Sequence, residues 1–246
     1  MRRTPGPTDA PAPGPDVGVD LIARRFDAHA DTYDESRVHV DLAALVARKA
    51  LASLPGVTTL RVVDVATGTG LVLRALVEGI ADRVSDGTPG KGVELTGIDV
   101  SAGMLDHARA HLPGVTWIQG DATHLPMPGG SLDAVTCAAA LHLFPDPAAA
   151  VADWVRALRP GGVAVVATFA TRGHSHGDDH APDGHGISDT SVAATGHGAA
   201  EILGTPQAIA ALLPPGLELE DTDKHRLADD VWLISTLRRV DTPDAQ

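Results

Sequence analysis

The stretch LRVVDVATGTG, at residues 60–70, joins a β-branched apolar run to a glycine-rich turn. Apolar side chains then recur at helical spacing, at Leu73, Leu76, Val77 and Ile80. This order predicts a buried strand, a tight turn and a helix. Because Gly68 and Gly70 lack side chains, a ligand can approach the backbone and the helix N-terminus there, although a plain tight turn would give the same pattern.

The strand-and-helix unit repeats along the chain. Strands are expected at residues 60–65, 93–98, 115–118, 132–137, 163–169, 217–220 and 231–236. Two helical patterns precede the first strand, and others separate most of the later ones. This alternation predicts an α/β fold with a Rossmann-like, doubly wound, mostly parallel seven-stranded sheet and helices on both faces. Ligands bind such sheets at the carboxyl ends of the strands.

The chain divides into a tail and one domain. Residues 1–18 are rich in proline and glycine, which predicts a disordered tail. Residues 19–240 are expected to form a single domain, because 246 residues with 43% hydrophobic content suffice for one core. Within that domain, residues 170–200 hold Gly, Asp and His without apolar periodicity, which indicates a long loop.

Charge and composition limit the partners. A formal net charge of −13 repels phosphates, so we expect a small-molecule substrate and no nucleic acid. Cys137 is the only cysteine, which excludes an intramolecular disulfide. No secretory signal and no membrane-spanning run is recognisable, so a cytoplasmic protein without a membrane contact is expected. The pattern leaves the oligomeric state open.

The glycine-rich turn lacks the features of other nucleotide sites. A dinucleotide fingerprint requires a third glycine where Leu73 stands, which disfavours NAD and nucleotide-sugar enzymes. A phosphate-binding P-loop would continue with Lys and Ser or Thr, whereas apolar residues follow Gly70. The ends of three predicted strands carry acids instead: Asp64, Asp99 and Asp121. Three carboxylates around one crevice repel a polyphosphate and favour a cationic ligand with hydroxyls.

S-adenosylmethionine matches this description, because it has a sulfonium, an ammonium group and a ribose with two hydroxyls but no phosphate. Asp99, at the end of the second predicted strand, is placed to accept hydrogen bonds from both ribose hydroxyls. Two other interpretations stay open at this point. Asp99 would also suit a helix cap, and Asp121 would suit a plain β-turn after Gly120.

Several segments resemble, in chain order, the motifs of class I S-adenosylmethionine-dependent methyltransferases. They are VVDVATGTG (62–70), GIDVSAGML (97–105), GDATHLP (120–126), LDAVTC (132–137) and LRPGG (158–162). The segment FDAHADTYD (26–34) is similar to the entrance helix of the ubiquinone/menaquinone-type small-molecule enzymes. One departure is Ala66, where many members carry glycine, although the quinone-type group also shows alanine.

The resemblance implies a set of cofactor-binding residues. They are Tyr33, Asp64, Ala66, Thr67, Gly68, Gly70, Asp99, Val100, Met104, Asp121 and Ala122. In the family, the position of Asp64 and the glycine-rich turn face the methionine part, and that of Asp99 the ribose. Asp121 and the Ala122 amide would contact adenine, with Met104 beside the ring. Tyr33 would touch the cofactor, although it would also suit packing between helices.

The activity implied is methylation of a small-molecule acceptor at oxygen or carbon. Methyl transfer from a sulfonium is an in-line displacement, so alignment and exclusion of water matter more than a strong base. His142, just beyond the fourth predicted strand, is the candidate base, and packing at the start of the next helix is the alternative. A different class remains open: a protein that binds S-adenosylmethionine on this fold as a sensor, or for a rearrangement, without methylating.

A histidine-rich segment lies in the long predicted loop. Its histidines are His174, His176, His180, His185 and His197, with several aspartates among them. Their spacing matches no defined zinc site, and the glycines predict a flexible chain, so no metal is expected. A solvated loop is the favoured interpretation, and a lid over the substrate is the other.

Overall fold

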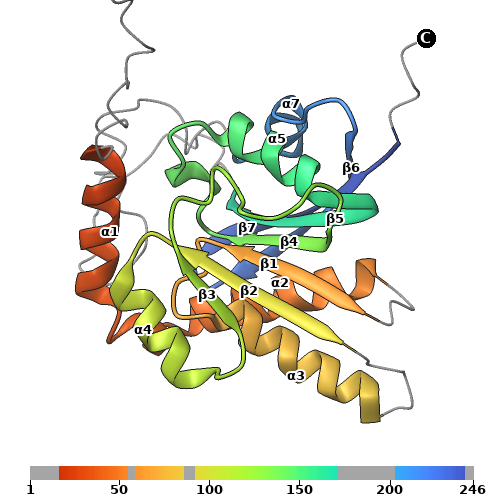
Figure 1. Ribbon diagram of the computed structural model, residues 1–246. Coiled ribbons are helices and arrows are strands. Elements are labelled where there is room, and N and C mark those ends of the chain that lie inside the picture. The colour runs from red at the N-terminus through yellow and green to blue at the C-terminus, as the bar shows by residue number, and fades with distance from the viewer. Residues whose placement is uncertain (1–16, 55–58, 86–91, 171–202, 242–246) are drawn as a thin grey trace, which may run out of the picture.

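The computed structural model describes residues 17–54, 59–85, 92–170 and 203–241 (Figure 1). Its elements are α1 (Val17–His29), η1 (Tyr33–Glu35), α2 (Arg37–Ser53), β1 (Leu60–Val65), α3 (Leu71–Ser85), β2 (Val93–Asp99), α4 (Ala102–His111), β3 (Thr116–Gln119), β4 (Leu132–Ala138), η2 (Leu141–Leu143), α5 (Pro147–Ala157), β5 (Leu158–Phe169), α7 (Pro206–Ala211), β6 (Leu217–Leu227) and β7 (Asp230–Arg239). Helix α1 begins at Val17, and residues 1–16 of the predicted tail lie outside the described ranges, so the disordered tail stays a prediction.

The strands form one sheet in the order β3-β2-β1-β4-β5-β7-β6. β1 to β5 run parallel, whereas β7 pairs antiparallel with β5, and β6 antiparallel with β7. The predicted Rossmann-like, mostly parallel sheet of seven strands is therefore confirmed.

The last two strands are longer than their apolar pattern predicts. β6 and β7 extend past the expected ranges 217–220 and 231–236, and they pair up to Leu227 and Asp230 beside the turn. β6 is an edge strand, and most of its side chains are at least partly exposed. Polar residues are therefore tolerated there, and the apolar pattern ends before the strand does.

Helices cover both faces of the sheet (Figure 1). On one face, α2 and α3 pack on the strands through a core that includes Val46 and Leu73, both fully buried. On the other face, Trp154 of α5 and Ile209 of α7 belong to a second core. Leu73, where a dinucleotide site would need glycine, is thus a packing residue between α3 and its neighbours.

The direction of the connections changes between β1 and β4, which are neighbours in the sheet. β1 leads into α3 on one face, and β4 leads through η2 into α5 on the other (Figure 1). A crevice at the carboxyl ends of the strands is expected at such a switch point.

Among the helices described, none is long and apolar enough to cross a membrane.

Candidate functional site: a pocket at the carboxyl edge of the sheet

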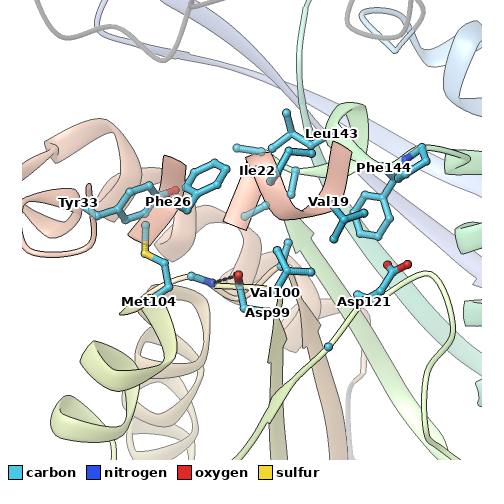
Figure 2. A pocket seen from close by; sticks show the side chains of 18 residues that line it. Val19, Ile22, Phe26, Tyr33, Asp99, Val100, Met104, Asp121, Leu143 and Phe144 are labelled. Carbon is cyan, nitrogen blue, oxygen red and sulfur yellow. Dashed lines mark hydrogen bonds between the residues drawn. The ribbon is translucent and has the colours of Figure 1, made fainter. Parts of the chain in front are cut away.

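A pocket lies at the carboxyl edge of the sheet (Figure 2). The space between its walls, with the open solvent at its mouth included, is about 700 Å³. The segments that follow β1, β2, β3 and β4 line it, together with α1, η1 and η2. The structure brings these predicted residues together in its wall: Tyr33, Ala66, Gly68, Asp99, Val100, Met104, Asp121 and Ala122.

The glycine-rich turn leaves open space above its backbone. Gly68 has φ +56°, and the described atoms within 4 Å of a Cβ placed on it are Met104 Sδ and Tyr33 Cε1, both at 3.9 Å. Ala66 also has a positive φ, 51°, which is uncommon for a residue with a side chain. Both residues line the pocket. The turn is therefore held in a conformation that brings bare backbone to the cavity.

Asp99 places a carboxylate at the floor of the pocket. One oxygen, Oδ2, accepts from Gly68 N at 2.8 Å, and Oδ1 accepts from Ser101 N at 2.9 Å. Burial raises the pKa of Asp99, while the N–H donors of Ser101, Gly68 and Val100 oppose that rise. Each oxygen of a carboxylate has a second lone pair, so Asp99 can accept further hydrogen bonds from a ligand.

Asp121 lies at another part of the wall, after β3 (Figure 2). Its Oδ1 accepts from the Thr123 N–H at 2.9 Å and from the Thr123 hydroxyl at 2.7 Å. These two bonds form an Asx turn, which holds the carboxylate beside the cavity. The neighbouring Ala122 is buried, and its carbonyl oxygen accepts from Trp154 Nε1 at 3.3 Å, which ties this loop to α5.

Tyr33 both lines the pocket and packs against the start of α2. Its ring stacks on His39 with a centroid distance of 4.0 Å, and His39 Nδ1 donates to the Tyr33 carbonyl at 2.9 Å. The next residue, Asp34, accepts from the hydroxyl of Thr69 and from the guanidinium of Arg74. Burial and the nearby acids raise the pKa of Tyr33, so its hydroxyl remains a hydrogen-bond donor at neutral pH.

Solved methyltransferase structures share this fold. An S-adenosylmethionine-dependent methyltransferase from Mesorhizobium loti superposes with a TM-score of 0.55 and 26% identity, over 81% of this chain and 100% of that one. The N-methyltransferase NodS from Bradyrhizobium japonicum, in complex with S-adenosyl-l-homocysteine, gives a TM-score of 0.62 at 17% identity, over 91% and 99% of the two chains.

The sequence comparison agrees with the structural one. Residues 63–166 match the family described as "Methyltransferase domain". The chain therefore resembles methyltransferases in sequence over its central part and in fold over most of its length. Its relatives include a demethylmenaquinone methyltransferase from Beutenbergia cavernae, 35% identical over 153 residues, which are 62% of this chain and 56% of that protein. The chain thus spans little more than half the length of this relative.

The pocket has the features that S-adenosyl-L-methionine requires of a binding site. The wall combines a buried acid, Asp99, with an open space over Gly68 and an apolar surround. Among the described residues, the charged side chains that line it are Asp99 and Asp121, both acids, so a phosphorylated ligand would be repelled. A ligand with hydroxyls and positive charge would find complementary groups.

Three residues of the expected cofactor set do not line the pocket: Asp64, Thr67 and Gly70. Asp64 is buried below the turn, where it accepts from the hydroxyls of Thr67 and Thr136, each at 2.6 Å. At Gly70, a Cβ would lie 2.8 Å from the ring of Trp117, so glycine is required for packing. These three residues therefore stabilise the glycine-rich turn by hydrogen bonds and packing on the side away from the pocket.

Asp64 should make the stability of the domain depend on pH. Burial raises its pKa from 3.8 to about 7. Since the folded state then holds the proton more tightly than the unfolded state, the contribution is fully present below about pH 4 and is lost as the pH rises through about 7. We expect the free energy of unfolding of the wild type, minus that of Asp64→Asn, to fall between pH 5 and pH 8 in urea titrations. A difference that stays constant would contradict this assignment.

The sequence analysis missed most of the apolar wall. It is formed by Val19, Ile22 and Phe26 of α1, and by Leu143, Phe144 and Pro145 around the end of η2. Figure 2 shows side chains of α1 across the cavity from Asp99, Val100 and Asp121. The helical spacing of the three α1 residues places them on one face of the helix, and this pattern could have indicated that they form part of the wall.

His142 lies in η2 and does not line the pocket. Its ring contacts Phe169, at the end of β5, edge-on with a centroid distance of 6.0 Å, and Phe169 packs on Trp232. Burial lowers the pKa of His142, which keeps the imidazole neutral near pH 7. A neutral imidazole can accept a proton, and this one lies next to the segment that lines the pocket.

The histidine-rich segment 174–197 lies outside the described residues, so its role as loop, lid or metal site stays a prediction. Within the described ranges, no group of three or more His, Cys, Asp or Glu side chains could hold a metal ion.

Proposed function

We propose that the protein transfers a methyl group from S-adenosyl-L-methionine to a small-molecule acceptor, at an oxygen or a carbon atom. The observation that carries this proposal is the pocket at the switch point, where the buried Asp99 and the bare backbone of Gly68 meet an apolar wall. The net charge of −13 supports a small acceptor in preference to a nucleic acid.

Residues from three strand ends would hold the cofactor. Asp99 would accept from the ribose hydroxyls, as its place at the end of β2 favours. Asp121 and Ala122 would bind the adenine, and Tyr33 and Gly68 the methionine part. The bound cofactor supplies a methyl group on a sulfonium, which is activated for displacement. The apolar side chains of α1 would exclude water from the reaction.

His142 would serve the acceptor and not the cofactor. Its ring points to Phe169, and Ala138 to Ala140, which precede it, line the pocket. As a neutral base it would take a proton from an acceptor hydroxyl or acidic carbon. An acceptor that ionises easily would need this help less.

The relatives suggest which acceptors to test first. The protein from Beutenbergia cavernae is named a demethylmenaquinone methyltransferase, so reduced quinones and related phenols should head the panel. Purified protein, S-adenosylmethionine and each acceptor should release S-adenosylhomocysteine together with a methylated product, identified by mass spectrometry. Tight binding of S-adenosylmethionine without a product from any acceptor would favour the alternative, a sensor or a rearrangement enzyme that keeps this fold.

A further inference from the structure

The end of α1 is bonded to the start of α4 through one side chain. Asp27 Oδ1 accepts from the Ser101 hydroxyl at 2.6 Å and from the Gly103 N–H at 2.9 Å. Ser101 is the N-cap of α4, and its oxygen also accepts from Met104 N at 3.1 Å. We call Asp27, Ser101 and Gly103 the α1–α4 junction. A carboxylate at a helix N-terminus is favoured by the partial positive charge there.

The junction requires a close approach of two backbones. A Cβ on Gly103 would lie 3.1 Å from Asp27 Oδ1 and 3.3 Å from Asp27 Cα. Since such distances are tighter than ordinary van der Waals contact, a side chain at position 103 would require Asp27, and with it the end of α1, to shift by a few tenths of an ångström. The absence of a side chain at Gly103 thus permits the observed position of α1.

α1 in turn forms part of the cofactor pocket. Val19, Ile22 and Phe26 line the cavity, and Figure 2 shows them across it from Asp99. Among the described helices and strands, α1 packs mainly against α4 (Figure 1). The junction is therefore one polar part of the contact that fixes α1 over the cavity; just after α1, Asp31 Oδ1 also lies 2.8 Å from Nε2 of His107 in α4.

We propose that Asp27 is a positioning residue: its bonds to Ser101 and Gly103 hold α1 over the bound cofactor and thereby set the rate at which the cofactor exchanges. This inference rests on the proposed function, since it needs a cofactor in the pocket. A cofactor covered by three apolar side chains of α1 leaves fast only when α1 moves, and such a movement of α1 away from α4 must break both hydrogen bonds of Asp27.

A purely structural role of Asp27 would have a different signature. If Asp27 served only to stabilise the N-terminus of α4, its loss would lower the melting temperature and leave the exchange rate of the folded protein unchanged. Gly103→Ala separates the two roles. Alanine is favoured over glycine in a helix, so this variant should not melt earlier, yet its methyl group should displace α1.

The test measures the dissociation rate of radiolabelled S-adenosylhomocysteine, chased with excess unlabelled compound, together with the melting temperature. We expect Asp27→Ala to release the compound about tenfold faster or more, because two hydrogen bonds to a charged group are lost. Asp27→Asn, which keeps an acceptor oxygen without the charge, should fall between Asp27→Ala and the wild type. Gly103→Ala should also release it faster, with an unchanged or higher melting temperature.

Asp106→Ala is the matched control, since Asp106 is an exposed acid of α4 that pairs with Arg109 within that helix. Its dissociation rate should equal that of the wild type. Equal rates in Asp27→Ala, Gly103→Ala and the wild type, with binding intact, would overturn this inference and leave the proposed function standing. A wild-type protein that binds neither S-adenosylmethionine nor S-adenosylhomocysteine would overturn the proposed function, and this inference with it.

Discussion

Asp99→Ala should bind S-adenosylmethionine about 10- to 150-fold more weakly than the wild type, which corresponds to the loss of about 1.5–3 kcal/mol from hydrogen bonds to a charged group. The buried carboxylate has accepting capacity beyond its bonds to Gly68 and Ser101, and the ribose hydroxyls would use it. Isothermal titration calorimetry measures the change directly.

The same substitution also removes two bonds that hold the glycine-rich turn, so the melting temperature must be measured alongside. Asp229→Ala, an exposed acid in the turn between β6 and β7, controls for the loss of one negative charge. It should leave the affinity unchanged. An Asp99→Ala variant that is folded and binds with wild-type affinity would remove Asp99 from the site.

His142→Ala should lower turnover by about 100-fold, the lower end of the range for removal of a general base, because the cofactor is already activated. Affinity for the cofactor should stay nearly unchanged, since the imidazole faces Phe169 and does not line the pocket. Initial rates with saturating acceptor and calorimetry with S-adenosylhomocysteine measure the two quantities separately.

A control and a pH profile distinguish catalysis from packing at this position. His124 is exposed in the turn after Asp121, and His124→Ala should keep full turnover. The wild-type rate should fall at acidic pH as the imidazole of His142 is protonated, and its lowered pKa moves that fall to a pH below the ordinary value for histidine. If His142→Ala only melts earlier, with turnover per folded molecule unaltered, the residue packs and does not catalyse.

The α/β architecture and the acids of the pocket could be predicted from the amino-acid sequence. A β-branched run, a glycine turn and a helical period follow each other directly around residues 60–80, so local order alone predicts the unit. Asp99 and Asp121 follow predicted strands, and parallel strands bring their carboxyl ends to one edge. The sequence could therefore predict that Asp99 and Asp121 gather in one crevice, whereas its placement of Asp64 there was wrong.

The direction of individual side chains depended on tertiary pairing. Asp64 was expected at the cofactor, yet the register of β1 on β4 places it opposite Thr136, and both of its oxygens accept from buried hydroxyls. His142 was likewise expected at the pocket, but its ring contacts Phe169 instead. Periodicity indicates that a residue is buried, whereas the face of the sheet on which its partners lie follows from pairing between distant segments.

What the sequence by itself determined is the Rossmann-like fold, the type of cofactor and the two acids of the pocket, because these follow from residue order within short segments. Only the tertiary structure decided how the pocket is closed. The contact between Asp27 and Gly103 joins residues 76 positions apart, and it depends on the missing side chain at position 103. No local pattern encodes such an approach, since it arises only when α1 and α4 have been brought together by the rest of the fold.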